Sequence, residues 1–467
     1  MKNSFLMNLI DKTPVAVVGL GVSNLPLVDF LLCNGAKVTV YDKKSRGELG
    51  DTAKDLEKRG VRFVLGENYL DVKEKVIFRT PGIRPDAIKA PDDAYITSEM
   101  ELFFELSPAK LVAITGSDGK TTTTTLTHLF YKAQKARDKK GSAYVGGNIG
   151  SPLLPLVSNM TNDDVAVLEL SSFQLMGMRR APDAAAITNV TPNHLNWHTD
   201  MVEYVEAKKN ICGERTQKII LNADNDITAS FCPEDTPCVY FSSTKKKNEF
   251  TQKDAHLVYI NNGSIVYFDG ECETEVLRIS DIKLPGKHNV ENYMTAIALT
   301  FGEVEVEIYT DIAKSFGGVE HRLELVAARR GVKYYNSSID SSPSRTAAAL
   351  SALQEKPIVI CGGSEKGISY APLADVLCSR AKAVVLNGAS ADSIKRALDS
   401  CPALPDSQLE IFTEKDLTAA FYRAVSIAKE GDTVLLSPAS ASFDQFANFS
   451  ERGKAFKTLV LSLDEKN

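Results

Sequence analysis

The residues best suited to bind or react with a ligand lie between positions 111 and 125, LVAITGSDGKTTTTT. An apolar run predicts a buried strand, a glycine turn follows at 116–119, and a predicted helix then continues to about Ala136. A glycine turn at a helix N-terminus directs backbone N–H groups and the helix dipole at one anion. Lys120 adds a positive charge for the β- and γ-phosphates of a nucleotide, and Thr121 adds a hydroxyl for Mg²⁺. This pattern predicts a phosphate loop, shortened because Ile114 stands where the full motif has its first glycine.

Further polar residues follow hydrophobic runs in the same part of the chain. Residues 165–175, VAVLELSSFQL, predict a strand that presents Glu169, Ser171 and Gln174. A carboxylate in so apolar a strand is costly unless it is paired or binds a cation, and Mg²⁺ prefers carboxylates together with phosphate oxygens. His194 follows the predicted strand at 184–190, at the edge where α/β enzymes place their chemistry. Taken alone, His194 and Lys208 read as a solvated loop residue and an exposed charge.

The N-terminal segment has a glycine turn of its own. Residues 14–21, PVAVVGLG, predict a strand entering a turn, and a second predicted strand ends at Asp42. This is similar to a dinucleotide-binding fingerprint, except that Asn24 replaces its third glycine. The pattern leaves two interpretations open, a nicotinamide cofactor or a different nucleotide. Gly82, in a later Pro-Gly turn, is a candidate for contact with the same ligand.

Length and composition set the wider frame. At about 150 residues per domain, 467 residues predict three α/β domains, at 1–99, 100–317 and 318–467. The net charge of -6 gives no basic surface for nucleic acid, and we expect no membrane segment because no apolar run approaches the roughly 18 residues that a span requires. Eight scattered cysteines without a Cys-x-x-Cys pair indicate reduced thiols, so we expect a cytoplasmic protein.

In the third segment predicted strands alternate with predicted helices, and there is no phosphate-loop motif. Parallel strands are predicted at 333–336, 358–363, 383–387 and 433–437, each followed by small or polar residues. A doubly wound sheet binds its ligand at that edge. We therefore expect the third domain to close over a substrate held by the second. The predicted strand exits contain Asp340, Lys366 and Ser442.

Taken in order, these motifs resemble those of the Mur ligase family. The resemblance rests on GSDGKT at 116–121, GN at 147–148, LELSSFQL at 168–175, TNVTPNH at 188–194, GKHN at 286–289, HR at 321–322 and LSPASASFDQF at 436–446. It covers all three segments. Its specificity is highest in LELSSFQL and LSPASASFDQF, which select the family member that adds D-glutamate.

The resemblance implies an ATP-dependent amide ligase of peptidoglycan synthesis. ATP would phosphorylate the alanine carboxylate of UDP-N-acetylmuramoyl-L-alanine, and the amine of D-glutamate would attack the acyl phosphate through a tetrahedral intermediate, releasing ADP and phosphate. Two carboxylates and a triphosphate repel one another, so such a site needs cations and positioning more than a covalent nucleophile. The resemblance also implies two Mg²⁺ ions, a carbamylated lysine at Lys208, small-molecule substrates and a monomer. It favours UDP over a nicotinamide in the first domain.

The same resemblance assigns roles to individual positions. The catalytic set is Lys120, Lys208, His194 and Asn148. The ATP-binding set is Gly116, Ser117, Asp118, Gly119, Lys120, Thr121, Thr122, Asn289, Arg322 and Asp340. The metal ligands are Thr121, Glu169, His194 and Lys208. The substrate-binding set is Val22, Ser23, Asp42, Lys43, Lys44, Gly82, Asn148, Ser171, Lys366, Ser442, Phe443 and Phe449.

One motif departs from the family pattern. Where the family has Asn-Asp-Ser-Lys-Ala-Thr-Asn, this chain has NSSIDSS at 336–342, so that Ser337 replaces the acid expected near the ATP ribose. Asp340 is the nearest acid, and we hypothesise that it reaches the same ligand. Two alternatives stay open at this point. One is another ligase of the superfamily, such as a folylpolyglutamate synthase, and the other is a nicotinamide oxidoreductase or a non-catalytic nucleotide-binding module.

Overall fold

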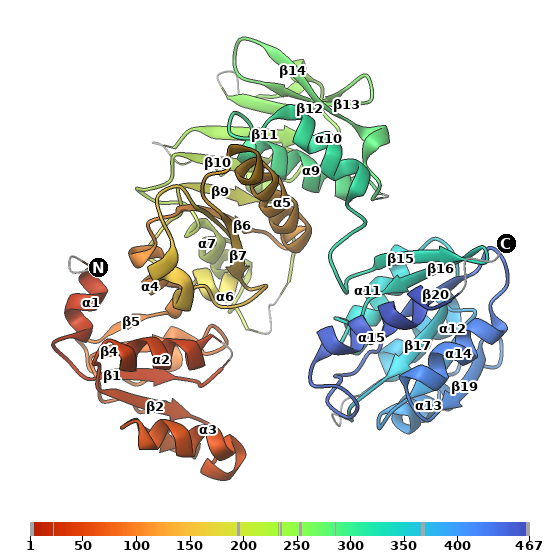
Figure 1. Cartoon of the computed structure of the whole chain (residues 1–467), viewed down its shortest axis with the longest axis horizontal. Coiled ribbons are helices and arrows are strands. Elements are labelled where there is room, and N and C mark those ends of the chain that lie inside the picture. The colour runs from red at the N-terminus through yellow and green to blue at the C-terminus, as the bar shows by residue number, and fades with distance from the viewer. Residues whose placement is uncertain are drawn as a thin grey trace. The chain divides into compact units, whose positions relative to one another are not determined.

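The computed structural model describes residues 4–463, apart from 22, 194–196, 232, 234–235, 252–254, 285 and 366–368. It divides into two compact units, Met1–Ser315 and Phe316–Asn467, which are described separately (Figure 1). Within the described residues, no helix combines the length and the apolar character needed to cross a membrane.

The first sheet is parallel throughout, with the order β3-β2-β1-β4-β5. Its central strand is a run of valine and alanine with every residue buried, as expected for a parallel sheet covered on both faces. The elements are α1 (Phe5–Ile10), β1 (Val15–Val18), α2 (Asn24–Cys33), β2 (Val38–Asp42), α3 (Arg46–Lys58), β3 (Arg62–Leu65), β4 (Val76–Arg79) and β5 (Tyr95–Thr97).

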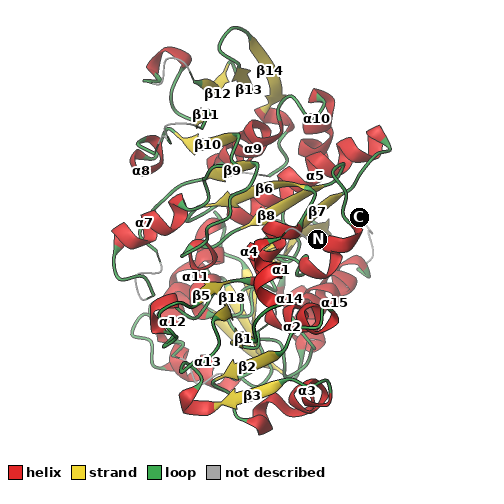
Figure 2. Cartoon of the chain, turned by 90° about the vertical axis from the view of Figure 1, so that its left-hand side faces the viewer, coloured by secondary structure: helices red, strands yellow, loops and turns green. Residues whose placement is uncertain are grey.

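The second sheet of the same unit has the order β14-β13-β12-β11-β10-β9-β6-β8-β7, which Figure 2 follows from β14 at the top. Strands β6 to β12 pair in parallel, and β12, β13 and β14 form antiparallel hairpins at one edge. Helix α5 packs on β7 and β8 and along α9, which covers β9 to β12. The strands are β6 (Lys110–Thr115), β7 (Ala143–Gly147), β8 (Val165–Glu169), β9 (Ala184–Ile187), β10 (Lys218–Asn222), β11 (Cys238–Ser242), β12 (His256–Asn261), β13 (Ser264–Phe268) and β14 (Glu273–Arg278). The helices are α4 (Glu99–Leu106), α5 (Lys120–Asp138), α6 (Ser172–Leu175), α7 (Met201–Lys209), α8 (Asp226–Ala229), α9 (Lys287–Thr300) and α10 (Val306–Ser315).

The C-terminal unit contains a third sheet with the order β15-β16-β20-β17-β18-β19, antiparallel only at the β15–β16 pair. Two hydrophobic clusters cover its faces, so helices flank it on both sides (Figure 1). The strands are β15 (Glu324–Arg329), β16 (Val332–Asn336), β17 (Ile358–Gly362), β18 (Ala383–Asn387), β19 (Glu410–Glu414) and β20 (Thr433–Leu436). The helices are α11 (Pro343–Ala352), α12 (Ala371–Arg380), α13 (Ala391–Asp399), α14 (Leu417–Ile427) and α15 (Phe449–Leu461).

The predicted α/β class with parallel sheets is confirmed, and two predicted strands are too long. The strand predicted at 184–190 ends at Ile187. Strand β8 ends at Glu169, and residues 172–175, which we predicted to continue it, form the short helix α6. The Ser171 hydroxyl accepts the Gln174 backbone N–H, while the Gln174 side chain accepts the Ser171 N–H. This capping box stops the strand directly after its carboxylate. It also commits the Ser171 hydroxyl, predicted to bind substrate, to the helix cap.

Candidate active site

The predicted phosphate loop connects β6 to α5, and its two glycines are sterically required. Gly116 has φ 149° and Gly119 has φ 79°, a region that favours glycine. A Cβ atom on Gly116 would lie 1.9 Å from Thr188 Oγ1, and one on Gly119 would lie 2.3 Å from Asn292 Oδ1. The loop is therefore shaped by Thr188, directly after β9, and by Asn292 of α9, as well as by its own sequence.

Hydrogen bonds hold this loop against the end of β9. The backbone N–H groups of Ser117 and Asp118 donate to the carbonyl and side-chain oxygens of Asn189, each at 2.9 Å. Lys120 folds back over the loop, and its Nζ donates to the carbonyls of Gly116 and Ser117 at 2.8 Å. Its ammonium group thus lies beside the turn that would surround a phosphate.

The carboxylate of Glu169 lies at the end of β8, beside β6. Its side chain is buried, and Oε1 accepts a 2.8 Å hydrogen bond from Asn148 Nδ2. Oε2 is also buried and has no hydrogen-bond partner among the described residues. Such an oxygen is costly in a protein interior unless a cation or a further donor completes it, so this carboxylate fits a Mg²⁺ ligand. His194, predicted to share that ion, lies outside the described residues.

Lys208, at the end of α7, is buried beneath the phosphate loop. Its side chain is 2% exposed, and Nζ donates to the Gly116 carbonyl at 2.8 Å. Burial, together with the nearby charge of Lys120, lowers the pKa of Lys208 from 10.5 to about 6. The side chain therefore carries a neutral amine at neutral pH, and its interpretation as an exposed charge is wrong.

A cavity of about 340 Å³ opens beside the loop, within the size range of small-ligand pockets. Asn289 lies on the first turn of α9, where its Oδ1 accepts from Asn292 Nδ2 at 3.3 Å. Thr121 is buried and Thr122 half-buried at the start of α5. The cavity is lined by Asp118, Gly119, Thr188, Asn189, Phe241, His288, Glu291, Asn292 and Thr295.

In the first domain, Asp42 stabilises the glycine turn after β1. The two oxygens of Asp42 accept the backbone N–H groups of Leu20, at 2.6 Å, and Lys44, at 2.9 Å. Asn24, at the position of the third glycine, donates its amide to the Gly19 carbonyl at 2.8 Å. The carboxylate thus holds the glycine turn in place. In a nicotinamide site it would instead accept from a ribose hydroxyl.

The other predicted contacts of the first domain lie around that turn. Lys43 and Lys44 are exposed and Ser23 is half-buried, while Val22 is outside the described residues. Gly82 is exposed, and its carbonyl accepts the indole N–H of Trp197 from the central domain at 3.2 Å. The edge of the first sheet therefore offers accessible positive charge for a diphosphate.

In the C-terminal unit, Asp340 lies at the carboxyl edge of the sheet but is buried. It accepts a 2.8 Å hydrogen bond from the Ser437 hydroxyl, and burial raises the pKa of its carboxyl group. Arg322 is exposed, as are Phe443 and Phe449, the first of these at 74%. Ser442 is buried, and Lys366 lies outside the described residues.

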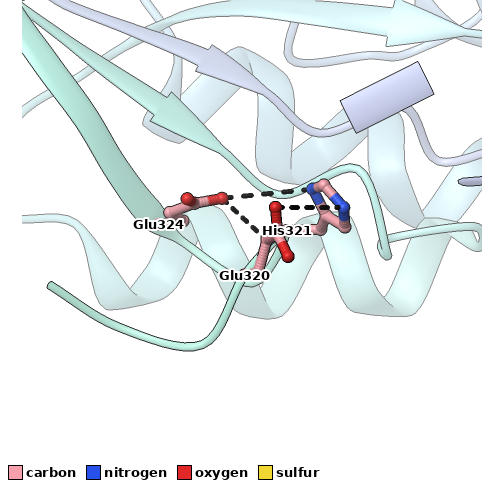
Figure 3. A group of neighbouring side chains, drawn as sticks. All are labelled: Glu320, His321 and Glu324. Atoms are coloured by element: carbon pink, nitrogen blue, oxygen red, sulfur yellow. Dashed lines mark hydrogen bonds and ion pairs between the residues drawn. The ribbon is translucent and has the colours of Figure 1, made fainter. Parts of the chain in front are cut away.

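The same unit brings together Glu320, His321 and Glu324. The carboxylate oxygens and the imidazole nitrogen that could bind a metal ion lie within 4.8 Å of one another (Figure 3). Lys457 donates to both carboxylates, at 3.1 Å and 2.6 Å. The two ring nitrogens of His321 meet Asn336 Nδ2 at 2.9 Å and Ser450 Oγ at 3.1 Å. These partners make the cluster an ion-pair network that ties β15 to α15.

Sequence reasoning did not find a second network, between the first and central domains. His198 is buried, with Nδ1 3.1 Å from Glu203 Oε2 and Nε2 2.9 Å from Ser172 Oγ. Arg84 forms two hydrogen bonds to Glu203, at 2.8 Å and 2.9 Å. The only available signal was the combination of the chain's single tryptophan, Trp197, with a histidine directly after it.

Comparison with known proteins is consistent with this geometry. Residues 114–300 match the Mur ligase middle domain, and residues 321–440 match the Mur ligase glutamate ligase domain. The UDP-N-acetylmuramoylalanine–D-glutamate ligase of Clostridium novyi is 44% identical over 473 residues, covering 99% of this chain and all of the relative.

Solved structures support the fold. The UDP-N-acetylmuramate-alanine ligase MurC of Thermotoga maritima aligns with a TM-score of 0.54 and 18% identity, over 97% of this chain and 100% of its own. The MurF ligase of Thermotoga maritima, solved in complex with ADP, aligns with a TM-score of 0.50 and 16% identity, over 97% and 96% of the two chains. The chain therefore belongs to the Mur ligase family, among the UDP-N-acetylmuramoylalanine–D-glutamate ligases.

Proposed function

We propose that this protein joins D-glutamate to UDP-N-acetylmuramoyl-L-alanine at the expense of ATP, in the cytoplasm. The observation that carries the proposal is the pairing of a phosphate loop with a buried, incompletely bonded carboxylate. Glu169 Oε2 lacks a partner among the described residues, and β8, which ends at Glu169, pairs directly with β6, which leads into the loop. A nucleotide phosphate would bind to the loop, and its Mg²⁺ would bind to the Glu169 carboxylate.

In this reaction the protein supplies charge and position. The N–H groups at the start of α5 and the Lys120 ammonium would bind the β- and γ-phosphates, with Thr121 at the metal. Bound Mg²⁺ would neutralise the repulsion between the phosphates and the alanine carboxylate. The alanine carboxylate attacks the γ-phosphorus and ADP leaves. The amine of D-glutamate then attacks the acyl carbon, and phosphate leaves from the tetrahedral intermediate.

Lys208 has a further proposed role, as a carbamate. Its neutral amine would attack CO₂, forming an N–C bond and releasing one proton, so that a buried amine becomes an anion beside the phosphate loop. That anion would share a second metal ion with His194. The low pKa of Lys208 supports this step, because only an unprotonated amine is nucleophilic.

The remaining residue assignments follow the domain boundaries at 1–99, 100–317 and 318–467. The first domain would bind UDP through Val22, Ser23, Lys43, Lys44 and Gly82, with Asp42 shaping the turn. The third would bind D-glutamate through Lys366, Ser442, Phe443 and Phe449. Arg322 and Asp340 would reach the nucleotide from the same domain.

Release of phosphate from ATP tests the proposal. We expect release only when both UDP-N-acetylmuramoyl-L-alanine and D-glutamate are present, and we expect its loss in Lys120→Ala. Release with a folate acceptor, or with neither acceptor, would contradict the substrate assignment. A Lys120→Ala protein with wild-type turnover would contradict the role of the phosphate loop.

A further inference from the structure

The junction between the first and central domains contains a charged network that takes no part in the proposed reaction. It joins the turn after β4, at Gly82 to Arg84, to residues 197–203 of the central domain. Arg84 and Glu203 are 119 residues apart, and their side chains are only 20% and 22% exposed. A guanidinium that donates twice to one carboxylate fixes direction as well as distance.

The central-domain side of this network is tied to both metal-site elements. Glu203 lies in the first turn of α7, and Lys208 lies in its last turn. His198 bridges Glu203 to Ser172, the first residue of α6, three residues after Glu169. Since a helix of this length moves as one body, anchoring its first turn also positions its last. His198 therefore holds α7 and the end of β8 in one arrangement.

The first-domain side is the turn that we assign to the UDP end of the substrate. Arg84 Nη1 also donates to the Trp197 carbonyl at 2.8 Å, and the Trp197 indole N–H donates to the Gly82 carbonyl at 3.2 Å. The indole ring lies against Phe173 of α6, with ring centroids 4.4 Å apart. Substrate held at this turn is thereby connected to the helices around the proposed metal site.

We propose that Arg84, His198 and Glu203 are positioning residues that couple the UDP-binding turn of the first domain to the helix carrying Lys208. This inference rests on the proposed function, because it assumes that the substrate spans both domains. Without the coupling, the phosphate loop would keep its two backbone bonds to Asn189 and would meet α7 through the Lys208 bond to the Gly116 carbonyl. The defect should therefore be larger with the UDP substrate than with ATP.

The kinetic test compares Arg84→Met, Glu203→Gln and the double variant with Arg215→Met. Arg215 forms an equivalent two-bond ion pair with Asp183, which precedes β9, and provides the matched control. We expect kcat/KM for the UDP substrate to fall roughly tenfold in each single variant, with a much smaller change in the KM for ATP. The double variant should lose less than the product of the two single losses, because both changes remove the Arg84–Glu203 pair. Arg84→Lys should restore part of the loss.

Trp197 provides a readout that does not depend on turnover. Because the chain has one tryptophan, its fluorescence reports this junction alone. We expect Arg84→Met to shift the emission to longer wavelength, as the indole gains solvent, and Arg215→Met to leave it unchanged. UDP titrated into the wild-type protein should change the emission until the site is saturated.

The coupling is refuted if Arg84→Met and Glu203→Gln stay within about twofold of Arg215→Met in kcat/KM, or if their losses multiply in the double variant. If Arg84→Met does not fold, Glu203→Gln, which keeps the shape of the side chain, carries the same test. Absence of substrate-dependent phosphate release in the wild-type protein would instead refute the proposed function. In that case an unchanged emission in both Arg84→Met and Glu203→Gln would refute the junction independently.

Discussion

Replacing Lys208 with methionine should stabilise the protein while abolishing its activity. The side chain is buried, and the pKa of its amine falls from 10.5 to about 6. At about pH 7 folding must therefore remove a proton that the unfolded lysine keeps. At about 1.4 kcal/mol per pH unit, that deprotonation costs folding about 5 kcal/mol. The variant also loses the hydrogen bond to Gly116, which costs it about 1 kcal/mol. We therefore expect the free energy of unfolding of Lys208→Met to exceed that of the wild-type protein by about 4 kcal/mol.

The sign of the pH dependence follows from the same shift. Below about pH 6 both states bind the proton, so the full cost of burying the charge is present. Between about 6 and 10.5 the unfolded state binds one more proton than the folded state, so wild-type stability rises with pH. The advantage of Lys208→Met should therefore shrink by about 3 kcal/mol from about pH 7 to about pH 9.

Urea unfolding followed by Trp197 fluorescence measures this difference within the first unit. The buffer should be free of metal ions and purged of CO₂, so that neither a cation nor a carbamate stabilises the wild-type site. Lys209→Met is the matched control, because Lys209 is the next residue on the same helix, with a side chain that is 36% exposed and paired with Glu206. A Lys208→Met protein that is no more stable than wild type, or whose advantage does not change with pH, would refute the assignment of a neutral buried amine.

Three further changes test other parts of the site. Glu169→Gln should lower turnover by roughly 10- to 100-fold and raise the Mg²⁺ concentration required for half-maximal activity. If the variant needs the same Mg²⁺ concentration as the wild-type protein, Glu169 is not a metal ligand. Gly119→Ala should weaken ATP binding in calorimetry and lower the free energy of unfolding by about 1–3 kcal/mol beyond Gly270→Ala, which has a similar positive φ but no atom near its added Cβ. A comparable effect of both glycine substitutions would rule out the contact with Asn292 as the cause. Asp340→Ala should raise the KM for ATP, and an unchanged KM would exclude this carboxylate from the nucleotide site.

Local sequence signals predicted the elements whose cause is local. Strand β6, the glycine turn and α5 follow from an apolar run, a turn and a helical stretch that are contiguous in the chain. Asn262 and Gly263 both have positive φ between β12 and β13, and an Asn-Gly pair between two apolar runs is itself a local signal for such a hairpin turn. The overlong strand at 165–175 had a local signal too, the Ser-x-x-Gln capping box, which the β-propensity of the preceding residues outweighed.

Features that depend on distant contacts could not be predicted from the sequence. The burial of Lys208 arises from the packing of α7 against the loop 92 residues earlier in the chain. Asp42 reads as a ligand for a ribose, but it accepts the N–H of Leu20 because β1 and β2 are neighbours in the sheet. Arg84 and Glu203 reside in different domains, and neither has a local pattern that distinguishes it from a surface charge.

The long-range bonds around the glycine turn have a consequence for synthesis of the chain. Asp118 is held by a residue 71 positions later, and Asn292, which leaves no room for a Cβ atom on Gly119, also accepts from Thr123, 169 positions earlier. A ribosome must therefore translate most of the central domain before this turn acquires its final shape. Nascent fragments that stop short of α9 should not retain ATP, so nucleotide affinity marks the completion of the domain.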